Sequence, residues 1–135
     1  MNNNIFIVTS LSFLLSTTAC AEDSHNTQFN TLHCLGTEPF WSIDLQENDI
    51  RLEDLNMTEQ HFKLTQVIMS SNHTNKWFLT AKSKNQNDLL TISLSKTGQC
   101  SDDMSDFNYE YEIIVSTPDA LVLSGCCNRI DTTEK

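Results

Sequence analysis

The stretch Tyr109-Glu110-Tyr111-Glu112-Ile113-Ile114-Val115 decides the fold class of this 135-residue chain. Its odd-numbered positions are aromatic or aliphatic, and two of the three positions between them are glutamates. Successive side chains of a β-strand point to opposite faces, so this period of two predicts a strand with one buried and one wet face.

Similar strand patterns recur along most of the chain. Stretches rich in turn-forming Asn, Asp, Ser and Pro separate them at hairpin spacing. The predicted strands are 41–45, 50–55, 61–69, 76–83, 90–95, 109–115 and 120–124. Seven or eight such strands predict an all-β fold, a small antiparallel β-barrel or sandwich.

The N-terminal segment is typical of an export signal. The apolar run Ile5–Leu15 has the length of a signal-peptide core and is too short to span a bilayer, and small residues lead from it to Cys20. We expect a signal peptide at 1–19 and a lipid anchor and tether at 20–33, with Cys20 as the lipidation site. A single β domain is expected at 34–135. The alternative is ordinary cleavage at Ala19-Cys20-Ala21, with secretion to the periplasm.

Four further cysteines follow: Cys34, Cys100, Cys126 and Cys127. An even number in an exported domain predicts two disulfides. Adjacent cysteines on a strand point to opposite faces, so we expect Cys34 to pair with one of them and Cys100 with the other. The sequence leaves both pairings open. The rival interpretation is a soft-metal site at Cys126 and Cys127, although C-x-x-C spacing is absent.

The charge balance limits the kind of partner. The chain has 18 acidic and 8 basic residues and a net charge of -10. Nucleic-acid binding requires a basic face, so this charge argues against a nucleic-acid partner. It is compatible with a cationic partner or with a plain solvated acidic surface. We expect no cofactor and no metal, because the acidic residues lack the spacing of a calcium loop.

Two segments supply the candidate ligand-binding residues. In Gly36-Thr-Glu-Pro-Phe-Trp41, we expect Gly36 to take a positive φ and Trp41 to be the first inward side chain. In Ser101-Asp-Asp-Met-Ser-Asp106, polar side chains follow Cys100. The candidates are Glu38, Phe40, Trp41, Asp102 and Ser105. The alternative is structural, with an aromatic plug in the first segment and turn or capping residues in the second.

Together with Gly125-Cys-Cys127, these segments resemble a family of small, largely uncharacterised bacterial envelope lipoproteins. That family is marked by a G-T-E-P-F-W box, an S-D-G-M-S-D box followed by Y-P, and a terminal G-C. The first box matches throughout, whereas the second departs at Asp103, where the pattern has glycine, and at Phe107-Asn-Tyr109. The resemblance implies an envelope location and the fold, not an activity. Likeness to sorted lipoproteins, in which residues such as Ala21 follow the anchor, implies the outer membrane, facing the periplasm.

No catalytic residue is predicted. The chain lacks G-x-S-x-G, H-E-x-x-H and phosphate-loop motifs, and its four histidines are scattered. We expect a non-catalytic binding module anchored to the membrane, with a small molecule or an envelope protein as its ligand. One specific form is an inhibitor of a cationic lytic enzyme such as lysozyme. The alternative is a carboxylate-dependent cell-wall hydrolase, with Glu38 and Asp102 as acid and base.

Overall fold

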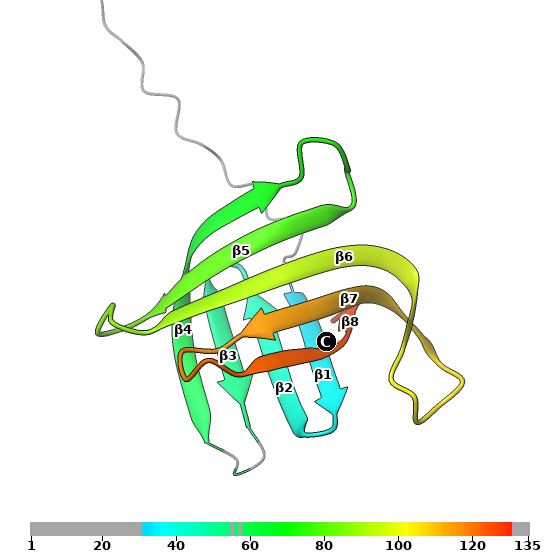
Figure 1. The fold of residues 1–135 in the computed structure, drawn as a ribbon, viewed down its shortest axis with the longest axis horizontal. Coiled ribbons are helices and arrows are strands. Elements are labelled where there is room, and N and C mark those ends of the chain that lie inside the picture. Colours follow the sequence, from blue (N-terminus) through cyan, green and yellow to red (C-terminus); the bar gives the residue numbers. More distant parts are fainter. Residues whose placement is uncertain (1–30, 55, 57, 131–135) are drawn as a thin grey trace, which may run out of the picture.

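Eight antiparallel strands form a closed barrel in a computed structural model that describes residues 31–130, except 55 and 57. The strands are β1 (Thr31–Thr37), β2 (Phe40–Gln46), β3 (Asp49–Glu53), β4 (Glu59–Met69), β5 (Lys76–Ser83), β6 (Leu89–Ser101), β7 (Asn108–Ser116) and β8 (Val122–Arg129) (Figure 1). Each strand pairs with its neighbour in sequence, and β1 pairs with β8. The predicted all-β fold is confirmed, and it is the barrel rather than the sandwich.

The expected signal peptide, Cys20 and most of the expected tether lie outside the described residues. Within the described part of the chain, no helix is long and apolar enough to cross a membrane.

The barrel has two walls whose strands run in different directions. In Figure 1, β5, β6 and β7 run across the view, while β1, β2 and β3 run steeply behind them. Strand β4 belongs to both walls, because its first part pairs with β3 and its later part with β5. A shift of register between Leu64 and Gln66 lies within that second pairing. A bulge of this kind bends a strand and lets it turn from one wall into the other.

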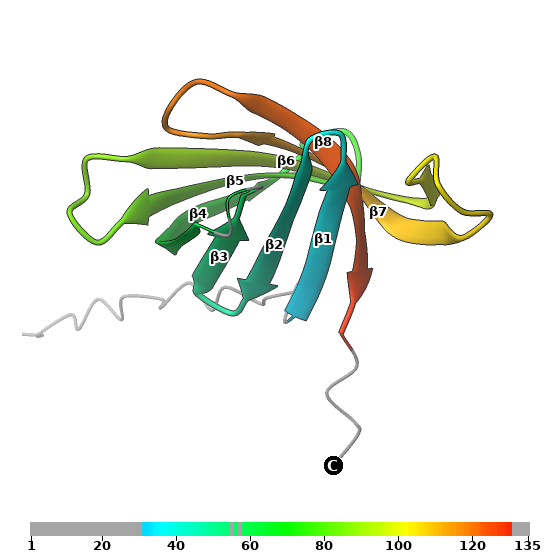
Figure 2. The ribbon, with the colours of Figure 1, turned by 90° about the horizontal axis from the view of Figure 1, so that it is seen from below.

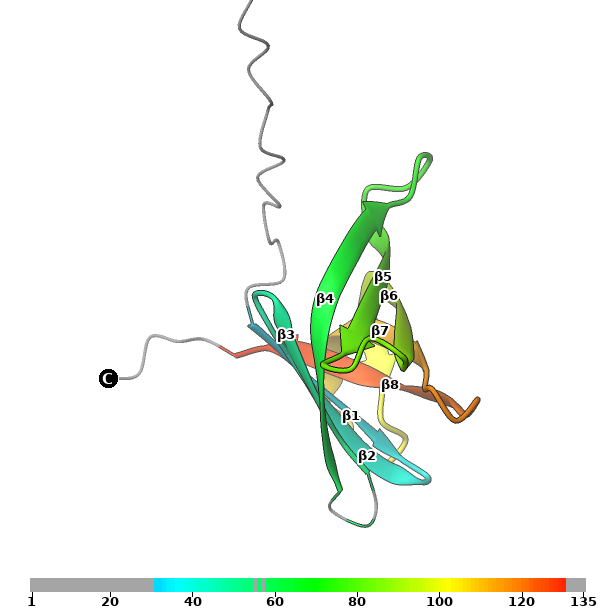
Figure 3. The same ribbon diagram turned by 90° about the vertical axis from the view of Figure 1, so that its left-hand side faces the viewer.

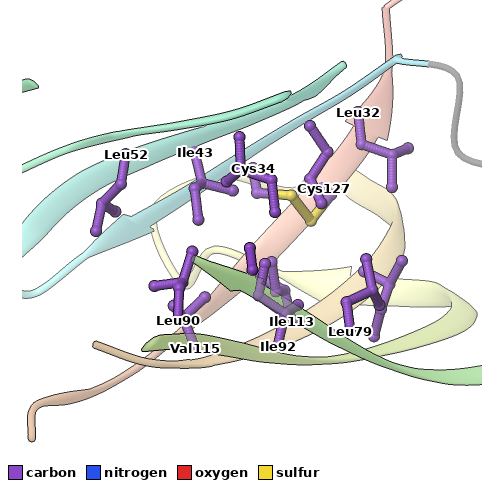
Figure 4. Close-up of a cluster of buried hydrophobic side chains, with 14 of the residues drawn as sticks. Leu32, Cys34, Ile43, Leu52, Leu79, Leu90, Ile92, Ile113, Val115 and Cys127 are labelled. Atoms are coloured by element: carbon purple, nitrogen blue, oxygen red, sulfur yellow. A yellow bond between two sulfur atoms is a disulfide. The ribbon is translucent and has the colours of Figure 1, made fainter. Parts of the chain in front are cut away.

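Alternation along the strands fills the interior with apolar side chains. Figure 4 shows residues of both walls, such as Ile43 and Ile92, directed into a common core. Each large aliphatic side chain buried in this way contributes about 1.5–3 kcal/mol. The fully buried side chains include Leu32, Ile43, Ile50, Leu79, Leu90, Ile92, Leu94, Tyr111, Ile113 and Val115.

Two disulfides fasten β8 to its surroundings on both sides of the sheet. Strand β1 meets β8 only along Leu32–Leu35, and within this short seam Cys34 is opposite Cys127 and bonded to it inside the barrel. The adjacent Cys126 bonds Cys100 at the end of β6. The expected divergence of the two adjacent cysteines is confirmed, and the structure selects one of the two open pairings.

Several element boundaries differ from the sequence-based expectation. Strand β1 was not predicted, and it begins at Thr31, ahead of the expected domain start at residue 34. Strand β6 extends to Ser101, and β8 starts at Val122 and continues to Arg129. These extra residues contain Gly and polar side chains, and they are held by strand pairing, β1 with the distant β8 and the end of β6 with the start of β7. Tertiary pairing therefore outweighs their weak local strand preference.

Candidate functional site

A pocket of about 410 Å³ lies against the outer wall of the barrel. Its sides come from the β1–β2 turn, the start of the β6–β7 loop and the outer faces of β7 and β8. The turn and the loop lie on the same side of the molecule (Figure 3), and the Thr37 hydroxyl lies 3.4 Å from the Asp102 carbonyl oxygen that accepts its hydrogen bond. The lining residues are Leu35, Gly36, Thr37, Glu38, Cys100, Ser101, Asp102, Asp103, Met104, Glu112, Ser124, Gly125 and Cys126.

The Cys100–Cys126 disulfide ties the loop side of this pocket to its floor. Cys126 lies on β8, and Cys100 is the second-last residue of β6. The loop that follows β6 projects from one end of the barrel (Figure 2). The register of β6 with β7 shifts between Lys96 and Cys100, and Gly98 in this segment has a φ of 66°. Glycine takes this left-handed conformation without strain, so the shift can form at little cost.

Asp102 organises the loop from within. Its carboxylate accepts hydrogen bonds from the backbone N–H groups of Met104 at 3.1 Å and Ser105 at 3.0 Å, and from the Tyr109 hydroxyl at 2.9 Å. The Met104 hydrogen bond is the main cause of the lowered pKa of Asp102; burial opposes the shift, and Tyr109 and Ser105 add to it. In turn, the hydrogen bond to Asp102 raises the pKa of Tyr109. Asp102 is therefore held ionised with its oxygens already engaged.

The charged residues that line the pocket all have the same sign. They are Glu38, Asp102, Asp103 and Glu112, and no Lys, Arg or His is among the lining residues. Asp103 has a φ of 58°, a conformation that glycine adopts more easily than other residues. We call this site the acidic pocket. Uncompensated carboxylates around a concave surface attract a cationic group such as an ammonium or a guanidinium.

The sequence-based candidates are divided between the pocket and other places. Glu38 and Asp102 line the pocket together, although they are 64 positions apart in the sequence. Ser105 is not a lining residue, and its hydroxyl donates to Asp102. Phe40 is 58% exposed at the start of β2 and is also outside the pocket lining. The cleft therefore lies on the outer wall, and of the candidates Glu38 and Asp102 line it.

Trp41 is an interior plug behind the pocket, only 5% exposed. Its expected inward orientation is confirmed. A Cβ on Gly36 would lie 2.0 Å from the indole Nε1 of Trp41, and one on Gly125 would lie 2.1 Å from the Leu35 carbonyl oxygen. The expected positive φ at Gly36 is wrong, because only Gly98 among the described glycines has one. Gly36 is required by close packing instead.

A second polar cluster, which the sequence did not predict, crosses β1 to β4. Strand register places His33 opposite Asp44, Asp44 opposite Arg51, and Arg51 opposite His61. His33 Nδ1 lies 2.6 Å from Asp44 Oδ1, and Arg51 donates to Asp44 and, at 3.1 Å, to Glu59. His61 Nε2 lies 2.6 Å from the other Glu59 oxygen. We call these five residues the charge ladder.

The electrostatics of the charge ladder centre on Asp44. Burial by itself raises the pKa of this carboxyl, but hydrogen bonds and charge from His33 and Arg51 outweigh burial, and the pKa is lowered from its ordinary value of 3.8. Asp44 is only 8% exposed. A buried carboxylate of this kind is stable only with its partners, so the ladder ties four strands together.

The cysteines that suggested a metal site are not available as ligands. Cys126 and Cys127 are both oxidised in disulfides, which overturns the soft-metal interpretation. Among residues 31–130, except 55 and 57, no group of three or more His, Cys, Asp or Glu side chains is arranged to hold a metal ion. No protein-family model, curated protein or solved structure matches the chain.

Proposed function

We propose that this protein is a non-catalytic binding module of the bacterial envelope that captures a cationic group of its partner in the acidic pocket. The main support for this proposal is that four carboxylates and no cationic side chain line a pocket of about 410 Å³. The net charge of -10 would steer a positively charged partner toward the molecule. The form we propose is inhibition of a cationic lytic enzyme such as lysozyme.

The proposal includes export and an anchor at Cys20, at the outer membrane facing the periplasm. Two disulfides support an oxidising compartment, because such bonds persist there and are rare in the cytosol. The left-handed backbone at Asp103 supports the family resemblance, since the corresponding residue of the family box is glycine. Mass spectrometry of the intact cellular protein tests this part. Acylation at Cys20 and four oxidised thiols are expected, and a full-length chain with free thiols would contradict it.

The binding proposal is tested by titrating the processed, oxidised chain into a lysozyme lysis assay. Inhibition at micromolar protein is expected, with a potency that falls as salt screens the charges. Undiminished lysis at that concentration rejects lysozyme as the partner.

A pair of matched variants separates the pocket from general charge. The pocket variant carries Glu38→Gln, Asp103→Asn and Glu112→Gln, and the control carries Glu47→Gln, Glu53→Gln and Asp119→Asn, all outside the pocket lining. Both lose three negative charges. The pocket variant is expected to lose about tenfold or more in potency and the control about threefold or less, because close charges act more strongly than distant ones. Equal losses would show that the pocket has no special part.

The hydrolase alternative is favoured by one observation, the presence of Glu38 and Asp102 in the same pocket. The lowered pKa of Asp102 and its engagement with the loop argue against a general-acid role for it. Peptidoglycan turnover that disappears in Glu38→Gln but survives in Glu53→Gln would support the alternative. Turnover that is absent, or is unchanged in Glu38→Gln, removes it.

A further inference from the structure

The outer face of β5, β6 and β7 carries a second pattern of side chains, which shares Glu112 with the acidic pocket. Strand register aligns its outward residues in three rows, each with a β6 residue between one from β5 and one from β7. The rows are Lys76–Ser95–Glu112, Phe78–Ser93–Ile114 and Thr80–Thr91–Ser116. The residues between them along each strand, such as Leu79, Ile92 and Val115, are buried in the core. We call this surface the β6 face.

The β6 face exposes apolar side chains in a strongly acidic protein. Phe78 and Ile114 are each 46% exposed, and Ile68 on β4, which is also exposed, is opposite Phe78. Two of the three rows contain no charged residue. Apolar side chains gathered on a surface with so little charge are typical of an interface.

The pattern is self-complementary about a two-fold axis that lies between two copies and runs parallel to β6. Such a rotation exchanges the two sides of the face, so β5 of one copy lies over β7 of the other, and each row meets its own counterpart. Phe78 is then opposite the second copy's Ile114, and Lys76 is opposite its Glu112. A two-fold dimer repeats each of these contacts, as isologous interfaces do.

The sizes of the side chains fit the same arrangement. The residues on the axis are Ser93, Ser95 and Thr91, which are small, while Phe78 and Ile114 stand on either side. Two sheets that pack face to face lie about 10 Å apart and interdigitate their side chains. Farther out, register places Ile68 and Ser124 at the two ends of the apolar row, so a large residue again meets a small one.

We propose that the β6 face binds a second copy of this chain. Lys76 and Glu112 are both exposed, and neither has an ion-pair partner within the described part of the chain. A second copy would satisfy both charges at once. An anionic membrane would be repelled by Glu112 and by the net charge of -10.

The expected dimer is weak and reversible. Strand and row spacings give this face roughly 300–500 Å² per copy. That area is below the approximately 800 Å² per partner of a standard stable interface. The proposal goes beyond the binding function, because it concerns self-association along β6, although Glu112 and Ser124 on the β7 and β8 side of the face also line the acidic pocket.

Sedimentation velocity of the unlipidated chain from residue 21, with its disulfides intact, tests the proposal up to about millimolar concentration. The wild-type chain is expected to dimerise. Lys76→Glu alone and Glu112→Lys alone place like charges opposite each other and are expected to weaken the dimer about tenfold or more. A one-to-one mixture of the two variants is expected to restore it, because every charged contact in the mixed dimer is again between opposite charges.

The mixture also controls for folding, because two misfolded variants would not form a dimer with each other. A wild-type chain that stays monomeric at the highest concentration overturns the proposal, and so does a mixture that remains as monomeric as its components. Binding of the same chain to vesicles of phosphatidylglycerol tests a membrane as the other candidate for this face. Binding to them by a chain that stays monomeric would assign the face to a membrane and overturn the dimer.

Discussion

The acidic pocket and the charge ladder both carry several ionisable side chains on the outer wall, but they differ in how the charges are arranged. In the ladder, basic and acidic side chains alternate across four strands, and Asp44 lies between His33 and Arg51. In the pocket, all charged lining residues are negative, and a disulfide holds the loop beside them. Charges that are neutralised within the chain serve stability, while charges left without a counterion are available to a partner.

The largest expected effect tests what holds the pocket. Replacing Cys100 and Cys126 together by Ser removes a bond between residues 26 positions apart and is expected to lower the free energy of unfolding by about 3 kcal/mol. Urea denaturation at pH 7 measures it. No residue of the charge ladder belongs to this disulfide, so the loss of stability at low pH that Asp44 causes is expected to persist in the double variant. An unchanged unfolding midpoint would contradict covalent support of the pocket.

The next largest effect tests the ladder. Asp44→Asn removes the charge between His33 and Arg51 and is expected to lower the free energy of unfolding by about 2 kcal/mol, because it leaves the Arg51 guanidinium and the His33 ring without their buried partner. The matched control is Asp49→Asn, which breaks the exposed ion pair with Lys63 and is expected to cost about 0.5 kcal/mol or less. Equal losses in the two variants would show that burial gives Asp44 no special weight.

The pH dependence of stability follows from the lowered pKa of Asp44. Its folded pKa is below 3.8, so the unfolded state binds the proton more readily. The stabilisation is therefore complete above about pH 5 and is lost as the pH falls through 3.8 and then through the lower folded value. Unfolding measured from pH 6 to pH 3 is expected to show a shallower acid decline in Asp44→Asn than in the wild type. Parallel declines would place the acid sensitivity elsewhere.

The smallest expected effect concerns the pocket loop. Asp103→Gly relieves a left-handed backbone with a φ of 58° and also gives the unfolded chain more freedom. Relief of the backbone strain stabilises the folded chain, whereas the added freedom of the unfolded chain destabilises it. We expect a net gain of about 0.5 kcal/mol in the free energy of unfolding. Asp103→Asn is the control, because it removes the charge and keeps the strain. A loss of stability in the glycine variant would show that Asp103 is held there by contacts rather than strained.

Much of the fold was predictable from the sequence, because apolar and polar residues alternate along half-buried strands. The stretch 109–115 is the clearest example, and its inward residues Tyr111, Ile113 and Val115 are fully buried. Strand β1 was missed because its apolar and polar residues alternate only weakly. Its position depends on pairing with β2 and with β8, which is far away in the sequence. The disulfide pairing was open for the same reason, since it depends on which strand closes the barrel.

The site was predictable only in part. Turn chemistry singled out Glu38 and Asp102, and the structure brings both to one pocket. Glu112 was not among the candidates, because in sequence it is an ordinary wet-face residue of a strand. The ladder was missed because its members are scattered in the sequence and meet only through the register of four strands. Side chains brought together by non-local pairing leave no spacing motif to recognise.

The binding proposal depends on the claim that the pocket carboxylates other than Asp102, which are Glu38, Asp103 and Glu112, are free for a partner and do not hold the fold. Its most direct test is the free energy of unfolding, in urea at pH 7, of the variant with Glu38→Gln, Asp103→Asn and Glu112→Gln. We expect a free energy of unfolding equal to that of the wild type or up to about 1 kcal/mol higher, because like charges are removed. A loss as large as that of Asp44→Asn would contradict it, since the pocket carboxylates would then be structural.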